Sequence, residues 1–423
     1  MKTGVEDILR CPVSAADLAL LARADLQLLK AGIQSGRLRH LNGAPVRLDL
    51  EAALATPDRG FVYPVVNGIF VLLPGMAIVD GSGPVIPAET DIGASTEAVM
   101  RFYDEVGWKK TDDNTYADAQ IFEDLRPVSQ EYIHMCHMRL RQHFPKRGTY
   151  LLDVASGPIQ YPEYLTYSEG YERRLCADVS FSALEGAKQK LGECGVYIQC
   201  DIQHLPIKDR KVDGFVSLHT LYHVPAQGQR RAFLELLRVL KDEGRGVVVY
   251  SWGSRSLLMR LLMPGPGRLR GARQVMCKLV RRLMGRANAA GPQSRAGALG
   301  GATARGAVAL PDTGIRPGFY AHDYAWYRRE LAPVCNTEIS CWRSVSVPFL
   351  KRYIRPGSFG RRFLRALFWL ESSYPRFFGR YGQYPALTFK RPTGSRGPGQ
   401  PTVGDGRRLR SEVSQTSAVG DQR

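Results

Sequence analysis

The sequence predicts an α/β fold with a mostly parallel sheet, because short apolar runs that end in acidic residues alternate with helical segments. The first run, residues 150–154, contains Asp153 and leads into a turn at Gly157. The second run, residues 175–178, ends in Asp178. In such sheets ligands lie at the carboxyl ends of the strands, and an acid after the second strand can accept hydrogen bonds from both ribose hydroxyls. The pattern therefore predicts a nucleoside-binding sheet.

The turn after the first strand indicates which nucleoside is bound. A dinucleotide site needs three glycines so that the backbone can approach a pyrophosphate. This turn has one glycine, Gly157, followed by Pro158. It suits a ligand without phosphates, and S-adenosyl-L-methionine (SAM) is the common one. The alternative is an ordinary strand–turn–helix unit that binds nothing.

Further elements follow along the chain. Residues 195–201 predict a third strand that ends in Asp201, and residues 212–218 predict a fourth strand that leads into His219. The remaining predicted elements are a helix over residues 231–240, a fifth strand over 246–250, a helix over 322–331, a strand over 337–347 and an antiparallel last strand over 384–390.

Together these segments resemble the class I SAM-dependent methyltransferases, near the ubiquinone/menaquinone type. The resemblance implies a Rossmann-like class I methyltransferase sheet with an antiparallel last strand, an enzyme that transfers a methyl group, and SAM as its cofactor. Asp242 and Glu243 stand where the family usually has Pro-Gly. The motifs that carry the resemblance are residues 152–157, 177–178, 200–202, 213–219 and 236–244.

The candidate cofactor-binding residues lie mostly at the predicted strand ends. Asp178 would hold the ribose, and Asp201 and Ile202 would hold the adenine. Gln160 would donate or accept a side-chain hydrogen bond where the family's other glycines are missing. Tyr103, on a helix before the sheet, would shield the sulfonium with a cation–π contribution, or would be an ordinary core aromatic. The full predicted set is Tyr103, Asp153, Ala155, Ser156, Gly157, Gln160, Asp178, Asp201, Ile202 and Leu218.

The candidate catalytic residues follow the fourth strand. Methyl transfer is an in-line attack on the SAM methyl, so the protein mainly aligns the acceptor and excludes water. A hydroxyl acceptor also needs a base. His219 is the best candidate because histidine titrates near neutrality, and Tyr222 and His223 lie one turn on. The alternative for each residue is a structural role, as a strand cap or a backbone hydrogen-bond partner.

Residues 1–80 predict a small α+β domain of their own. Ile8–Val13 and Tyr63–Pro74 resemble the first and last strands of the small zinc-ribbon-like methyltransferase-activator family. Zinc-binding versions use paired cysteines, whereas Cys11 is followed by Ser14 and no other cysteine precedes Cys136. One thiol cannot supply a four-ligand zinc site. We therefore predict a metal-free module, and the alternative is an unrelated domain rich in β-hairpins.

Composition predicts an intracellular enzyme. The eight cysteines show no pairing pattern, which favours reduced thiols. The first residues lack the apolar core of a signal peptide, and no apolar run approaches the ~20 residues of a membrane-spanning helix. We expect a cytoplasmic protein that can associate with a membrane surface.

The net charge of +18 originates in the last part of the chain, because residues 254–423 carry 30 Lys/Arg and 8 Asp/Glu. We predict a methyltransferase domain formed by residues 95–253 and 310–392. Residues 254–309 would be a basic, partly mobile insertion, and residues 393–423 a disordered tail.

Two basic segments with apolar clusters, residues 254–285 and 361–370, allow three interpretations. They form a lid or dimer helix packed on the core, or contact an anionic membrane, or bind nucleic acid. RNA binding usually needs exposed aromatic side chains. Phe363, Phe368 and Trp369 are grouped with leucines, so we expect them to be buried, which makes nucleic acid the least favoured partner.

The sequence favours a methyltransferase that acts on an oxygen or carbon of a small-molecule or lipid-linked acceptor. One alternative is an RNA or protein methyltransferase with a fused activator-like module, although Ser217–Thr220 stands where amino-nitrogen methyltransferases carry an Asn-Pro-Pro-Tyr motif. The other alternative is a non-catalytic scaffold that binds SAM.

Overall fold

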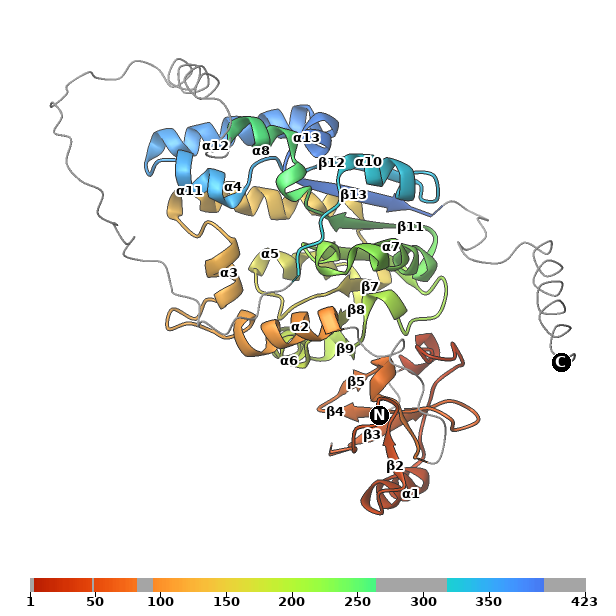
Figure 1. Ribbon diagram of the computed structural model, residues 1–423. Coiled ribbons are helices and arrows are strands. Elements are labelled where there is room, and N and C mark those ends of the chain that lie inside the picture. The colour runs from red at the N-terminus through yellow and green to blue at the C-terminus, as the bar shows by residue number, and fades with distance from the viewer. Residues whose placement is uncertain (1–3, 48, 82–93, 264–317, 392–423) are drawn as a thin grey trace, which may run out of the picture.

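The computed structural model describes residues 4–47, 49–81, 94–263 and 318–391. A small N-terminal module, red to orange in Figure 1, lies at one end of a larger α/β domain. Most of the predicted basic insertion, beyond Met263, and the predicted tail at 393–423 lie outside the described residues.

A single sheet runs through both parts, in the order β1-β3-β4-β5-β9-β8-β7-β10-β11-β13-β12. Its central strands are parallel neighbours, whereas β13 pairs antiparallel with both β11 and β12. The predicted Rossmann-like sheet with an antiparallel last strand is therefore confirmed. The strands of the large domain are β7 (Gly148–Val154), β8 (Tyr171–Asp178), β9 (Gly195–Gln199), β10 (Val212–Leu218), β11 (Leu240–Val249), β12 (Thr337–Arg343) and β13 (Tyr384–Lys390).

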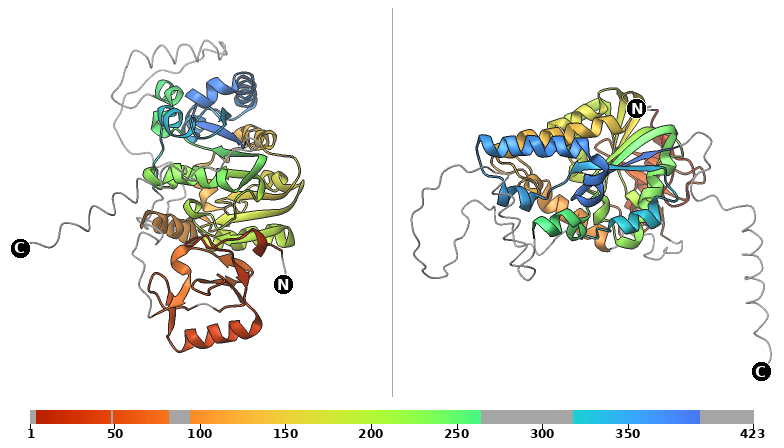
Figure 2. Two further views of the ribbon diagram at one scale, coloured as in Figure 1. Left: turned by 90° about the vertical axis from the view of Figure 1, so that its right-hand side faces the viewer. Right: turned by 90° about the horizontal axis from the view of Figure 1, so that it is seen from above.

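Helices cover both faces of this sheet, as the view from above in Figure 2 shows. Successive residues of β7 alternate between the faces: Leu152 packs with helix α7 (Ala226–Val239), and Leu151 packs with helices α4 (Pro127–Met138) and α6 (Phe181–Leu191). Because both faces are covered, the central strands are continuous apolar runs.

Several predicted boundaries differ in the structure. The helix before β11 ends at Val239, and β11 begins at Leu240 and not at residue 246. The strand predicted over residues 337–347 ends at Arg343, and helix α11 (Val347–Tyr353) begins at its predicted last residue. The predicted helix over residues 322–331 is one short turn, α10 (Tyr324–Trp326), that continues as a π-helix over Tyr327–Leu331. π-Helices are rare and arise from packing, so sequence periodicity does not reveal them.

The N-terminal module joins the sheet edge to edge. Its strand β5 (Ile69–Val71) pairs in parallel with β9, and Leu72 N donates to Gln199 O at 2.8 Å. The module thus buttresses the strand that leads to Asp201. Its other elements are α1 (Arg23–Gln34), β1 (Ala19–Leu20), β2 (Leu38–His40), β3 (Ala52–Ala55), β4 (Val62–Val66) and β6 (Ile78–Asp80).

Helices α8 (Leu257–Leu262), α11 (Val347–Tyr353), α12 (Ser358–Ser373) and α13 (Pro375–Tyr381) lie at the end of the molecule farthest from the module (Figure 1). The expectation that Trp369 is buried is wrong, because it is 64% exposed. At about 100° per residue, Trp369 lies about 140° around α12 from the buried Leu364. Phe363 and Phe368 are partly buried. Among the described helices, none is long and apolar enough to cross a bilayer.

Candidate functional site

The carboxyl ends of β7, β8 and β9 meet around a cavity of about 60 Å³. Asp178 and Asp201 both line it, together with Ala155, Ile202 and His223. We call it the carboxylate cavity. Two predicted acids, twenty-three positions apart in the sequence, therefore face one space at the edge of the sheet where α/β proteins bind ligands.

Asp178, the last residue of β8, is buried and held by the backbone. Its Oδ2 accepts from Gly157 N and its Oδ1 from Ser180 N, each at 2.9 Å. Burial raises the pKa of Asp178 to about 6. Each carboxylate oxygen can accept a second hydrogen bond, so the group can take two further donors from the cavity.

Asp201 lies across the cavity, at the start of a short helix over Ile202–His204. Its Oδ1 accepts from Gln203 N at 2.9 Å, which fixes the carboxylate as a helix cap. Ile202 and Leu205 add apolar wall beside it. This arrangement of one acid and two aliphatic side chains can hold a flat heterocycle that carries an amine.

The turn after β7 adopts an unusual backbone. Ala155, Gly157 and Ile159 have φ values of 52°, 54° and 53°, in the left-handed region that favours glycine. A Cβ atom on Gly157 would also lie 2.9 Å from the Trp108 ring. Strained backbone of this kind clusters at functional sites. Ser156 is buried in the turn, and its hydroxyl donates to Gly157 O at 3.1 Å.

Four of the ten predicted cofactor-binding residues line the carboxylate cavity, namely Ala155, Asp178, Asp201 and Ile202. The other six, Tyr103, Asp153, Ser156, Gly157, Gln160 and Leu218, do not line it. Asp153 accepts from Arg174 Nε at 3.1 Å, and Arg174 also donates to Tyr164 O, so this acid belongs to a buried ion pair between β7 and β8. Leu218 is partly buried at the end of β10, with its carbonyl accepting from Thr220 Oγ1.

A helix before the sheet is docked over the first turn. Helix α2 (Ala94–Phe102) continues as a π-helix over Tyr103–Gly107. The Tyr103 ring stacks on Trp108 with centroids 4.8 Å apart. Burial, with the charges of Asp118 and Asp178, raises the pKa of Tyr103 well above 10. Tyr103 is therefore a neutral phenol at physiological pH.

Side-chain hydrogen bonds link the docked helix to the start of α6, and α3 (Ala117–Phe122) to the turn after β7. Asp104 accepts from the hydroxyls of Ser180 and Ser182 at 2.5 and 2.7 Å, at the start of α6. Gln160 Nε2 donates to Asp118 at 3.2 Å, and Gln160 Oε1 is buried without a partner. Burial raises the pKa of Asp118 to about 6.

The three predicted catalytic residues lie in different surroundings. His219 has a φ of 61°, and its ring contacts Trp342 and Tyr384, with centroids 4.5 and 5.2 Å away. His223 lines the carboxylate cavity instead, with Nδ1 2.6 Å from Gly318 O. Since a carbonyl only accepts, this nitrogen carries the proton. Tyr222 is buried against Tyr250 and Phe319.

His219 is neutral at physiological pH. Burial lowers its pKa well below 6.5, and the nearby positive charge of Arg343 lowers it further. The imidazole therefore has a lone pair available for a proton. The residue as a whole is half-buried, and its ring lies among aromatic side chains.

Sequence reasoning missed the residues that surround His219. Arg343, at the end of β12, donates to Glu123 at 2.7 Å, and both are buried. The guanidinium carbon lies 4.7 Å from the Trp342 ring centroid and 4.9 Å from that of Tyr384. The aromatic cluster, as we call it, comprises His137, His219, Trp342, Arg343 and Tyr384.

Several polar atoms of the aromatic cluster are buried without partners. They are His137 Nδ1, Trp342 Nε1 and Arg343 Nε. Buried polar groups in folded proteins nearly always have hydrogen-bond partners, because an unmet donor costs about 1–3 kcal/mol. His137 Nδ1 lies 3.7 Å from Glu163 Oε2, whereas no described residue satisfies Trp342 Nε1 or Arg343 Nε. Trp342 and Arg343 lie within the predicted strand over residues 337–347, and the sequence pattern does not distinguish them from its other residues.

Comparison with protein families identifies the domain. Residues 152–248, less than a quarter of the chain, match the family model described as a methyltransferase domain. The chain therefore carries a segment similar to methyltransferase domains. The comparison with curated proteins found no match.

Solved structures with similar folds include enzymes of several specificities. Phosphoethanolamine N-methyltransferase 1 of Haemonchus contortus, solved with phosphoethanolamine and S-adenosylhomocysteine, is 14% identical over 78% of this chain and 55% of that one, with a TM-score of 0.39. Geranyl diphosphate C-methyltransferase of Streptomyces coelicolor is 12% identical over 71% and 98%, with a TM-score of 0.38. The Haloferax volcanii complex of the Trm112 methyltransferase activator with a putative methyltransferase is 13% identical over 63% of this chain and 92% of that one, with a TM-score of 0.35.

The chain spans little more than half the length of the Haemonchus enzyme 1 and 63% of enzyme 2. At these identities and TM-scores the neighbours do not indicate an acceptor.

The carboxylate cavity fits the chemistry of SAM but not its size. Asp178 and Asp201 offer acceptors to ribose hydroxyls and an amine, and their charge suits a cationic ligand. A cavity of about 60 Å³ is far below the about 300–1,000 Å³ of typical ligand sites. Thr96 and Val99 of α2 form one wall. An adenosyl ligand therefore requires outward movement of this wall.

Proposed function

We propose that the enzyme transfers the methyl group of SAM to an oxygen or carbon of a small-molecule or lipid-linked acceptor that lies against the aromatic cluster. The observation that carries this proposal is the position of a neutral, partly exposed His219 beside Trp342 and Tyr384. Unpartnered donors on Trp342 and Arg343 support it, because an acceptor oxygen would satisfy them.

The proposed roles follow the two parts of the site. Asp178 holds the ribose, Asp201 and Ile202 hold the adenine, and Tyr103 and Gln160 lie towards the methionine end. SAM supplies the methyl group when bound. His219 accepts the proton of a hydroxyl acceptor, and the positive charge of Arg343 stabilises an acceptor oxygen that becomes negative.

Labelled SAM tests the acceptor class. The enzyme is incubated with methyl-labelled SAM and fractionated cell extract, and we expect label in the lipid or small-molecule fraction. His219→Ala is expected to abolish labelling while SAM affinity stays unchanged. His134→Ala, which removes an exposed histidine outside the cluster, is the matched control. Label that enters RNA or protein instead would contradict the proposal.

We also propose that residues 1–80 are a metal-free, activator-like module that stabilises the catalytic sheet from within the same chain. Its support is backbone pairing on both sides of Asp201: β5 pairs with β9, and Arg10 N donates to Pro206 O at 3.0 Å. Cys11 is fully buried, 3.2 Å from the Tyr63 hydroxyl. Among the described residues no three His, Cys, Asp or Glu side chains form a metal-binding group. One zinc per chain in purified protein would overturn this proposal.

We propose a cytoplasmic protein that contacts an anionic membrane surface through residues 254–285. Its described part, Ser254–Met263, contains Arg260 and the exposed Leu257 and Leu261 of α8. Basic residues beside exposed leucines suit the boundary of an anionic bilayer. Loss of vesicle flotation on deletion of residues 264–285 is the expected result, and unchanged flotation would contradict this role.

A further inference from the structure

A surface on α12 and α13 exposes large apolar side chains that none of the described elements covers. Trp369 is 64% exposed, Tyr374 60%, Phe377 53% and Leu370 38%. These four residues are nearly consecutive, where α12 ends and α13 begins. Single exposed apolar residues are ordinary, but a contiguous group on a folded domain marks a contact surface.

The same segment is strongly basic. Residues 347–381 carry eight Lys/Arg and a single acid, Glu371. Among the described side chains, Arg361, Arg362 and Arg376 are exposed and form no ion pair. Arg365 pairs with Glu131 on α4 at 2.8 Å, so part of its charge is compensated.

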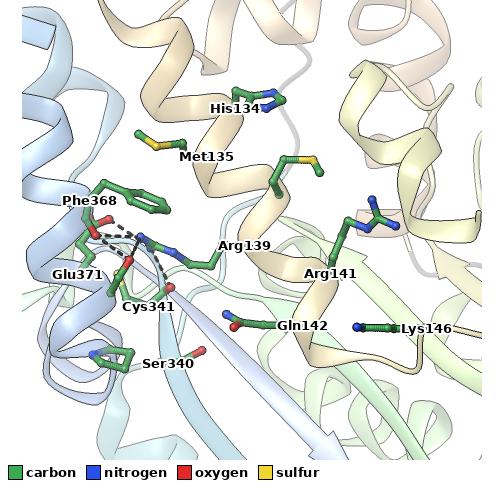
Figure 3. A pocket seen from close by; sticks show the side chains of 13 residues that line it. His134, Met135, Arg139, Arg141, Gln142, Lys146, Ser340, Cys341, Phe368 and Glu371 are labelled. Atoms are coloured by element: carbon green, nitrogen blue, oxygen red, sulfur yellow. Dashed lines mark hydrogen bonds and ion pairs between the residues drawn. The ribbon is translucent and has the colours of Figure 1, made fainter.

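The one acid of the segment does not offset this charge at the surface. Glu371 is fully buried and accepts from Arg139, Tyr132 Oη and Ser344 N. Figure 3 shows the adjoining groove of about 880 Å³, where Arg139 reaches across to Glu371 and Phe368. Lys146 also lines the groove. The positive charge of α12 and α13 therefore faces solvent.

Helix α8 belongs to the same layer. Ser256 Oγ donates to Tyr381 O of α13 at 3.2 Å, and Tyr353 Oη of α11 donates to Leu262 O at 3.4 Å. The exposed Leu257 and Leu261 of α8 thus lie in the layer that carries the α12–α13 surface.

We propose that the α12–α13 surface, formed by Arg361, Arg362, Trp369, Tyr374 and Phe377, docks on an anionic lipid bilayer. Charge complementarity commits it to this occupant: Glu131 offsets part of the charge of Arg361 and Arg365, and the remaining positive charge attracts anionic headgroups, with each cation contributing near the surface. Trp and Tyr are the residues enriched at the boundary between headgroups and acyl chains. The proposal is independent of the acceptor, because it depends only on this surface.

Other occupants fit the surface less well. A stacking platform for RNA places aromatic rings along a basic groove, whereas Phe368, the aromatic residue of the adjoining groove, has its ring covered by Arg139 at 4.0 Å. A second copy of this chain would place two basic surfaces against each other, which costs repulsion.

Vesicle flotation tests the surface with two paired substitutions in the full chain. Arg361→Glu/Arg362→Glu reverses charge, and Trp369→Ser/Phe377→Ser removes apolar contact. We expect each pair to lower partitioning onto vesicles of phosphatidylcholine with phosphatidylglycerol by at least about tenfold. Wild-type protein should bind pure phosphatidylcholine vesicles weakly, and added salt should weaken binding to the anionic vesicles.

Matched controls on the N-terminal module are Arg23→Glu/Arg47→Glu and Leu28→Ser, which make similar changes at exposed positions. They should partition like the wild type, and every variant should keep wild-type SAM affinity. As a second readout, bromo-lipids should quench tryptophan fluorescence, and Trp369→Phe should remove that quenching.

The proposal would be overturned if both double variants of the α12–α13 surface partitioned onto anionic vesicles like the wild type. So would a selective loss of binding to a labelled single-stranded RNA, or of self-association in sedimentation, with vesicle binding retained.

Discussion

The carboxylate cavity and the aromatic cluster share one edge of the sheet but are built differently. The cavity takes its acids from consecutive strand ends, so Asp178 and Asp201 are close in the sequence as well as in space. The cluster combines His137, His219, Trp342, Arg343 and Tyr384, which belong to four segments of the chain. Local sequence therefore determines the proposed cofactor side, whereas tertiary packing assembles the proposed acceptor side.

Their electrostatics also differ. On the cofactor side, burial raises the pKa of Asp178 and of the nearby Asp118 to about 6, so these acids favour added donors or cations. On the acceptor side, an arginine is already paired with Glu123 and a neighbouring histidine is neutral. A cation therefore suits the first region, and an oxygen that gains negative charge suits the second.

The largest expected effect is a loss of stability when the buried ion pair of the proposed acceptor side is removed. Arg343→Gln leaves Glu123 buried without its cationic partner, and we expect a loss of about 3–5 kcal/mol in the free energy of unfolding. Urea denaturation measures this. Arg365→Gln removes an exposed ion pair with Glu131 and should change stability little. Equal effects of the two substitutions would show that the buried pair has no special structural role.

The next largest effect is on cofactor affinity, which should depend on the carboxylate cavity and not on the aromatic cluster. Asp178→Ala should weaken binding of S-adenosylhomocysteine by about 1–3 kcal/mol, because a buried hydrogen-bond acceptor is lost. Calorimetry measures this, with Glu338→Gln as an exposed control on β12. His219→Ala should leave the affinity unchanged. If Asp178→Ala binds like the wild type, the ribose assignment is wrong.

The smallest expected effect is a pH dependence of cofactor binding. The ionised carboxylate of Asp178 accepts hydrogen bonds from hydroxyls, whereas its protonated form accepts them less well. Since its pKa is raised to about 6, affinity should be constant above pH 7 and fall as pH drops through 6.

If only the ionised form binds, the dissociation constant at pH 5 is about tenfold that at pH 8. Asp178→Asn should remove this dependence, and Asp118→Asn should retain it. A pH dependence that survives in Asp178→Asn would assign the titration to another group.

Sequence patterns predicted the sheet because its central strands are apolar runs bounded by turns, and the antiparallel last strand came with the family resemblance. They did not predict that Asp153 pairs with Arg174, since two residues on adjacent strands meet only once register is fixed. Nor did they predict that Glu123 pairs with Arg343 across 220 positions. The grouping of Trp369 with leucines in the sequence does not make it buried, because burial depends on the angle of a residue around α12.

A crystal structure with S-adenosylhomocysteine would test whether the carboxylate cavity binds the adenosyl group. We expect ribose hydroxyls within hydrogen-bond distance of Asp178 and adenine against Asp201 and Ile202. We also expect the wall formed by Thr96 and Val99 to be displaced outward. A ligand bound elsewhere, with Asp178 still bonded only to Gly157 N and Ser180 N, would contradict this binding mode.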